Sequence, residues 1–137
     1  MLYVPNQGHG LRDIQRVIGS VSAVHRYAAA GKPLPQTAWS FFGRPDTLGI
    51  QIKADRPTDG TLIWSAHSLT LDFREARWTS SKCARTNDGY ACSVTRDKDS
   101  YTAVFAETSF QDEGALPFST TTTMCIASPR VSEALGC

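Results

Sequence analysis

No cysteine precedes Cys83 in this 137-residue chain. Basic residues form no block, and the formal net charge is only +1 with both signs scattered, which argues against nucleic acid as the main partner. The sequence also has no apolar run of about 18 residues or more, so none of its segments is predicted to cross a bilayer. The first ten residues lack the apolar core of a signal peptide, and none is expected there.

Catalytic motifs are missing as well. The sequence has no G-x-S-x-G, no phosphate-binding G-x-x-x-x-G-K-[ST], and no strand-linked G-x-G-x-x-G. Its histidines, His9, His25 and His67, form no H-x-x-x-H pair that could hold a metal. A catalytic Ser–His–Asp triad, whose members need to meet only in the folded chain, stays open as a less favoured alternative. We therefore expect no enzymatic activity, no cofactor and no metal site.

Two weaker signals stay open as alternatives. The acidic segments 97–99 and 111–114 carry oxygen ligands that suit calcium, although acidic surface turns are far commoner. Trp39, Trp64 and Trp78 suit a carbohydrate or peptide site, although large aromatic side chains more often pack in a core.

All four cysteines, Cys83, Cys92, Cys125 and Cys137, lie in the C-terminal part of the chain. Their intervals are longer than those of common zinc sites, so disulfides are favoured over zinc ligands or free thiols. Of the three possible pairings, the sequential one closes two short loops, the first across an Asn-Asp-Gly turn. Disulfides indicate an oxidising compartment.

Residues 11–30 show the periodicity of an amphipathic helix. Gly31 is well placed to end it, and Gly19 either weakens the helix or leaves room for a close neighbour. We expect its apolar stripe to cover a sheet, with a polar face opposite. The stripe consists of Ile14, Val17, Val21, Val24 and Ala28.

After Pro35 the helical pattern ends, and threonine, serine and aromatic residues become frequent. This composition, interrupted by turn signals, predicts an antiparallel sheet of four to six strands. The expected strands are 47–54, 61–66, 68–73, 90–96, 100–106 and 118–126. The fold class predicted is α+β, with a long N-terminal helix packed on an antiparallel sheet.

Two stretches resemble the type IV pilins and the type II secretion pseudopilins. The first is SVSAVHRYAAAGKPLPQ, residues 20–36, which is similar to the end of that family's first helix. The second is CIASPRVSEALGC, which is similar to its C-terminal disulfide-bounded loop, with Cys125 and Cys137 in the places of the two cysteines. The family's apolar N-terminal helix half, with its glutamate, is missing from this sequence.

The resemblance implies a single pilin-like domain over 11–137 after a flexible segment over 1–10. That domain would contain a helix at 11–31, a connecting loop at 32–46, and the sheet with its disulfide loop at 47–137. It implies a structural subunit of a pilus (fimbrium) or secretion pseudopilus, located in an extracellular fibre at the cell surface or in the periplasm. Before assembly, the missing segment would anchor the subunit in the inner membrane, and this would be its only membrane contact.

The implied partners are other pilin subunits, bound through the uncovered helix face, with a host or surface receptor for cell adhesion as a further possibility. That helix face carries Arg12, Gln15, Arg16 and Ser22. The alternative function is that of a small secreted, disulfide-bonded, β-rich effector or binding protein.

Overall fold

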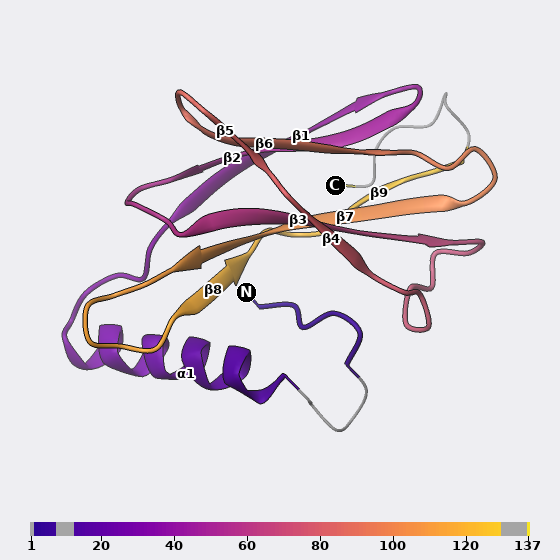
Figure 1. Ribbon diagram of the computed structural model, residues 1–137. Helices are drawn as coiled ribbons and strands as arrows, with labels where there is room; N and C mark the ends of the chain where they lie inside the picture. The colour runs from indigo at the N-terminus through magenta and orange to yellow at the C-terminus, as the bar shows by residue number, and fades with distance from the viewer. Residues whose placement is uncertain (1, 8–12, 130–136) are drawn as a thin grey trace.

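A computed structural model describes residues 2–7, 13–129 and 137 of the chain (Figure 1). Within this part, one helix precedes nine strands, and every strand pairing is antiparallel. The elements are α1 Ile14–Ala29, β1 Thr37–Arg44, β2 Thr47–Ala54, β3 Gly60–Ser68, β4 Thr79–Lys82, β5 Ala84–Thr86, β6 Gly89–Thr95, β7 Tyr101–Phe110, β8 Phe118–Thr121 and β9 Cys125–Ala127.

The strands form two sheets that face each other. Sheet A has the order β1-β2-β6-β5, and sheet B has the order β4-β3-β7-β8, with β9 pairing with the other half of β7. The segment that holds β4 and β5 passes from sheet B to sheet A at Cys83. Residues 2–7, which fall in the segment expected to be flexible, contact sheet B through a bond from the Tyr3 N–H to the Thr121 hydroxyl (3.2 Å).

The main core lies between the two sheets. Alternate residues of β2 point inward, as the alternation of Leu48, Ile50 and Ile52 in the sequence predicts. They meet inward-facing residues of sheet B, and aliphatic burial of this kind contributes about 1.5–3 kcal/mol per side chain. The sheet B contribution comprises Ile63, Val104, Ala106, Cys125 and Ala127.

The predicted fold class, α+β with a long helix covering a sheet, is wrong. The helix is short, 16 residues, and lies at one edge of a two-sheet sandwich, where its main strand contact is β8 (Figure 1). Because each sheet buries its apolar face against the other sheet, neither needs a helix to cover it. The protein is therefore a small, disulfide-bonded, β-rich sandwich.

The helix is also turned the opposite way from the prediction. Gly19, Ala23 and Tyr27 are its buried residues, whereas Val21 and Val24 of the predicted covering stripe are exposed. Small side chains set this orientation, since a Cβ at Gly19 would collide with the Pro117 carbonyl oxygen. The expected close neighbour of Gly19 is thus present.

Both ends of the helix follow from local chemistry. Asp13 caps the N-terminus by accepting a bond from the Arg16 N–H (3.4 Å). At the other end, Gly31 has a positive φ of 61°, and the Lys32 N–H bonds to the Tyr27 carbonyl (2.9 Å), as in a glycine-terminated helix. The predicted stop at Gly31 is confirmed.

Three strand expectations need correction. The segment 32–46, expected as a connecting loop, contains β1, which pairs with β2 along its whole length. The segment 68–73, expected as a strand, is mostly a loop in which Leu69 and Leu71 are exposed. The expected strand 118–126 is divided between β8 and β9, and the short strands β4 and β5 were not predicted.

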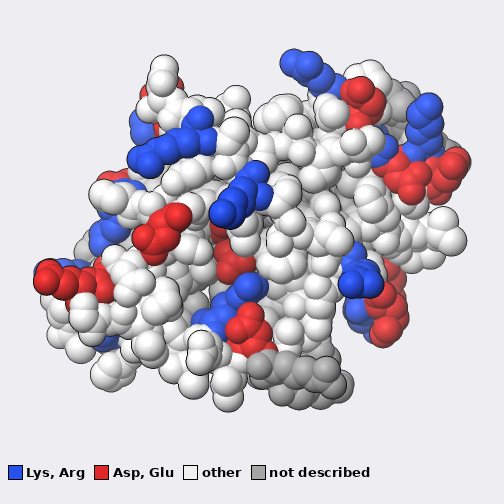
Figure 2. All heavy atoms as spheres, viewed as in Figure 1, with Lys and Arg blue, Asp and Glu red and all other residues white. Residues whose placement is uncertain are grey.

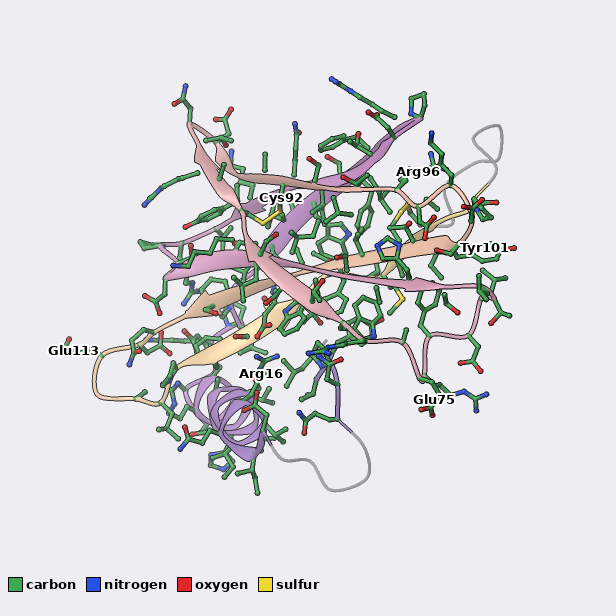
Figure 3. The ribbon with its side chains drawn as sticks, turned by 45° about the vertical axis from the view of Figure 1, so that its right-hand side comes forward. Arg16, Glu75, Cys92, Arg96, Tyr101 and Glu113 are labelled. Carbon is green, nitrogen blue, oxygen red and sulfur yellow. A yellow bond between two sulfur atoms is a disulfide. The ribbon has the colours of Figure 1, made fainter. Side chains whose placement is uncertain are left out.

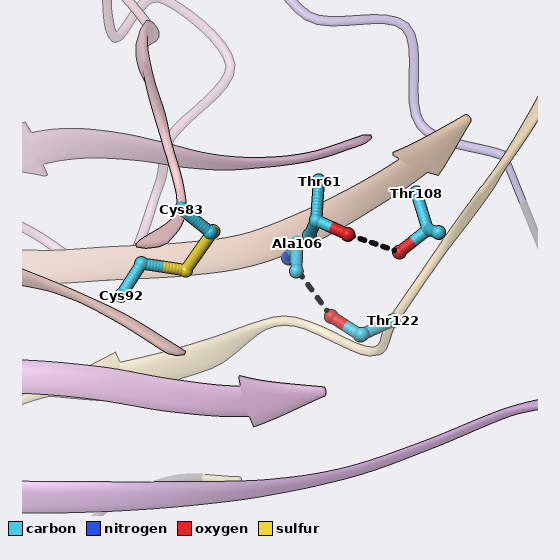
Figure 4. Close-up of a disulfide and its surroundings, with 6 residues drawn as sticks. All are labelled: Thr61, Cys83, Cys92, Ala106, Thr108 and Thr122. Atoms are coloured by element: carbon cyan, nitrogen blue, oxygen red, sulfur yellow. Dashed lines mark hydrogen bonds between the residues drawn. A yellow bond between two sulfur atoms is a disulfide. The ribbon is translucent and has the colours of Figure 1, made fainter. Parts of the chain in front are cut away.

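The cysteines form the disulfides Cys83–Cys92 and Cys125–Cys137, the sequential pairing that the sequence favours. Cys83–Cys92 ties the crossing between the sheets to β6 (Figure 4). The two-residue turn at 87–88, between Thr86 and Gly89, joins β5 to β6 as predicted. Residues 130–136, inside the second loop, lie outside the described part of the chain.

Hydroxyl groups satisfy buried polar positions in sheet B. Thr61 and Thr108 share a buried hydrogen bond (3.1 Å), and the Ala106 N–H donates to the Thr122 hydroxyl (3.0 Å) at the point where β8 ends (Figure 4). These bonds let the threonine-rich segment lie inside the fold, because a buried polar group without a partner is costly.

Candidate docking face and adjoining cleft

The helix carries an apolar surface that points away from the sandwich, and we call it the outer face of α1. It consists of Ile14, Ile18, Val21 and Val24, whose exposed fractions are 58%, 48%, 63% and 53%. The three- and four-residue spacing places them on one side of the helix, opposite Gly19 and the other buried residues. Along one side of this face runs an apolar groove of about 610 Å³, lined by residues that include Val17, Leu34 and Phe118.

On the other side of the helix lies a second depression, which we call the Glu107 cleft. Its volume is about 490 Å³, and it lies between α1, the outward side of sheet B, and the segment before β8. Its lining surface is mostly apolar and includes two charged side chains, Arg16 and Glu107. The lining residues are Gln15, Arg16, Ile18, Leu62, Glu107, Ser109, Leu116, Pro117, Phe118 and Ser119.

Glu107 is the more deeply buried of the two charged residues that line this cleft. Its side chain is only 3% exposed, and its Oε2 accepts a bond from the Trp64 indole N–H (2.7 Å) and pairs with Arg16 Nη1 (3.3 Å). The Arg16 guanidinium lies over the Trp64 ring at 5.5 Å from its centroid. Figure 3 shows Arg16 on the side of α1 that faces the strands. A buried carboxylate needs such partners because an isolated buried charge is strongly unfavourable.

A second polar cluster surrounds Tyr27 at the C-terminal end of the helix. The Tyr27 hydroxyl donates to Asp112 (3.0 Å) and accepts from Arg56 (2.8 Å), while Arg26 pairs with the same aspartate (3.1 Å). Burial, together with the bond to Asp112, raises the pKa of Tyr27 above its ordinary value of 10.0. Asp55 also pairs with Arg56 (3.5 Å), so two arginines face two aspartates and the charges cancel. We therefore interpret the cluster as one that holds the helix end in place, and not as a ligand site.

The residues predicted to form an assembly surface do not share one face. Arg16 points toward sheet B, which contradicts its expected place on the uncovered side, whereas Gln15 is exposed and Ser22 is half-buried. Arg12 lies outside the described residues, as does His9. The outer surface of the helix is therefore mainly apolar, with the exposed His25 among its aliphatic side chains.

The remaining candidates are scattered. Trp64 and Trp78 both pack near Phe105, with centroid distances of 6.3 and 5.2 Å, and Trp39 lies on β1 in the other sheet. His25 is exposed on the helix, and His67 meets the Thr102 hydroxyl at 3.1 Å. These histidines therefore do not converge.

Metal ligands do not gather in the described part of the chain, where no group of three or more suitable side chains occurs. The acidic segments considered for calcium are engaged instead. Hydrogen bonds from the Asp99 N–H and the Ser100 hydroxyl lower the pKa of Asp97, and Asp112 is held by Tyr27 and Arg26. Over the same residues, no helix is long and apolar enough to span a bilayer.

Charge on the visible surface is mixed, since Lys and Arg side chains alternate with Asp and Glu in small groups (Figure 2). No single-sign field covers this face, in agreement with the net charge of +1. Sequence reasoning missed the Glu107 cleft, although one signal was available: Glu107 is the single charged residue of the strand YTAVFAETSF.

The comparison with protein families overturns the pilin resemblance. A family model described as PhoPQ-activated pathogenicity-related protein matches residues 1–74, a span that includes α1 and β1 to β3. The pilin and type IV pilus assignments are therefore wrong. The predicted location in an extracellular fibre depended on them and is no longer supported. No curated protein and no solved structure matches the chain. Because the matched span exceeds half of its length, the chain belongs to the family of PhoPQ-activated pathogenicity-related proteins.

Proposed function

We propose that this chain is a non-enzymatic binding module that docks onto a protein partner through the outer face of α1. The two disulfides and the family match fit a protein of the bacterial envelope or a secreted one.

One observation carries the proposal: four large aliphatic side chains of one helix face are about half exposed or more. Single exposed apolar residues are ordinary, but a contiguous apolar patch marks an interaction site. Burying each of these side chains against a partner would contribute up to about 1.5–3 kcal/mol.

The shape of the patch favours a protein over a small ligand. Small molecules bind in sites that enclose most of their surface, whereas the outer face of α1 and the groove beside it form an extended open surface along the helix. Its apolar centre has polar neighbours, Gln15 on one side and His25 within the stripe, as protein interfaces commonly do. The partner surface should therefore be apolar and broad enough to receive three turns of helix.

The test compares two charged substitutions in tagged protein expressed in its natural host. Val21→Glu places a charge in the outer face, and Leu69→Glu places the same charge at an 82% exposed leucine in a distant loop. Native size measurement by light scattering should find a complex for the wild type and for Leu69→Glu, and only the monomer for Val21→Glu. Identical native masses for all three proteins, each shown to be folded by circular dichroism, would refute the docking function.

A further inference from the structure

We infer that the Glu107 cleft binds a free α-amino acid with an apolar side chain. The inference does not depend on the docking face, because it rests on the two charged groups that line the cleft and on the apolar residues that line it with them. Each charged group has part of its hydrogen-bonding capacity unused, and the two lie in direct contact.

The acceptor is the second carboxylate oxygen of Glu107. Both protein contacts of this carboxylate go to Oε2, from Trp64 Nε1 and from Arg16 Nη1. Among the residues that the structure describes, Oε1 has no hydrogen-bond partner, and Glu107 lines the cleft. A carboxylate oxygen has two lone pairs, so Oε1 can accept hydrogen bonds from a cationic group.

The donor is the outer end of the Arg16 guanidinium. The closest contacts of the guanidinium with the two carboxylates are those of Nε with Asp13 (3.1 Å) and of Nη1 with Glu107 (3.3 Å), so Nη2 is the nitrogen most available to a ligand. The Trp64 ring and these two carboxylates hold the guanidinium in place. Its free N–H groups therefore need little reorganisation to meet an anionic group.

A ligand that matches both groups is a zwitterion. Asp13 is 39% exposed and caps the helix N-terminus, so water and the helix dipole offset most of its charge. The two charges that face the cleft, those of Glu107 and Arg16, are therefore close to balanced, and a simple cation or anion would gain one attraction and meet one repulsion. An α-ammonium group on Glu107 Oε1 and an α-carboxylate on Arg16 Nη2 use both attractions. Such charge-assisted hydrogen bonds are the strong ones, and they strengthen where protein walls exclude water.

The walls specify the side chain of the ligand. Ile18, Leu62, Leu116 and Phe118 line the same cleft as the two charged groups, so an aliphatic side chain would replace water beside them. The volume of about 490 Å³ lies within the range of small-molecule sites. Leucine, which carries both charged groups and a branched aliphatic chain, is the appropriate probe.

Isothermal titration calorimetry of the purified protein tests the site with three ligands. L-leucine should bind, while 4-methylpentanoate, which lacks the ammonium, and isopentylamine, which lacks the carboxylate, should each bind about tenfold or more weakly. Glu107→Gln should also weaken leucine binding by about tenfold or more, because it keeps the shape and the acceptor for Trp64 but removes the charge. Leu69→Glu should bind leucine as the wild type does.

Three results would overturn the inference. These are the absence of leucine binding to the folded wild type, equal affinity for all three ligands, or unchanged leucine affinity in Glu107→Gln. In the first case, Glu107 and Arg16 form a structural ion pair only. Protein docking is measured separately by native mass, so either proposal can fail while the other stands.

Discussion

Val21 and Ala23 lie two residues apart on the same helix, yet their surroundings are opposite. Val21 is 63% exposed on the outer face, and Ala23 is fully buried against the sheet edge next to Phe110 and Phe118. Size, and not hydrophobicity, separates them. At Gly19 even a Cβ would collide with the carbonyl oxygen of Pro117, just before β8, and Ala23, one turn further along the same side, is fully buried, so a branched side chain would be crowded there.

This difference predicts the effect of the same substitution at the two positions. Ala23→Asp should lower the free energy of unfolding by about 3 kcal/mol or more, because it buries a charge without a partner. Val21→Asp should change it by no more than about 1 kcal/mol, the range of exposed helix positions. Urea denaturation of both variants measures this, and a larger loss for Val21→Asp would show that the helix is turned the other way.

Tyr27 makes the stability depend on pH at the alkaline end. Its pKa is raised in the folded protein by burial and by the bond to Asp112. Below pH 10 both the folded and the unfolded chain keep the proton, so this contribution to stability is fully present. Above pH 10 the unfolded chain ionises first, so the free energy of unfolding falls as the pH rises toward the raised pKa.

Tyr27→Phe should remove this part of the alkaline decline. The variant lacks the hydroxyl, so its unfolding free energy between pH 9 and 11 should fall less than that of the wild type. Thermal melts across this pH range provide the comparison. Parallel curves for the two proteins would mean that Tyr27 does not have a raised pKa.

At the scale of elements, the sequence predicts where the helix and most strands occur, but it does not predict how they pack against one another. The helix, its stop at Gly31, and β2 follow from periodicity and glycine chemistry, which act locally. The orientation of α1 does not follow from them. An apolar stripe predicts a buried face, but it does not say which surface buries it, and here the stripe is turned away from the sandwich. The inward position of Arg16 depends on Glu107 and Trp64, which are distant in the chain.

The strand errors have a similar origin. β1 was missed because Pro35 and Pro45 flank it and suggest a loop, while its register with β2 is set by a two-residue turn at 45–46. The stretch around Leu69 and Leu71 alternates like a strand but has no partner strand to pair with, so it remains a loop. Whether such a segment becomes a strand depends on a neighbouring strand to pair with, and the local sequence pattern carries no information about that neighbour.

The Cys83–Cys92 disulfide holds the segment that crosses between the sheets. Its removal should lower the stability of both sheets. Replacing both cysteines by serine should lower the free energy of unfolding by about 2–3 kcal/mol, through the loop-closure entropy returned to the unfolded chain. Denaturant titration of the double variant against the oxidised wild type measures the loss. An unchanged midpoint would indicate that β4 to β6 hold together without the bond.

At the scale of the whole molecule, the sandwich encloses a complete core between its sheets, and α1 lies at its edge. The helix buries Gly19, Ala23 and Tyr27 on the side of β8 and presents its large aliphatic side chains to the exterior. Such an arrangement is unfavourable for an isolated domain, since exposed aliphatic surface gains nothing in water. In our proposal a protein partner covers the outer face of α1, and its exposed aliphatic side chains are then buried in the interface.

Site-specific photo-crosslinking in the natural host tests this central claim most directly. A photoreactive amino acid at position 21 lies in the proposed interface, and the same amino acid at position 69 provides an exposed control in a loop. The account predicts one discrete cross-linked protein product from position 21, either a second copy of the chain or a different protein, and none from position 69. Absence of a product at position 21, or the same products from both positions, would contradict it.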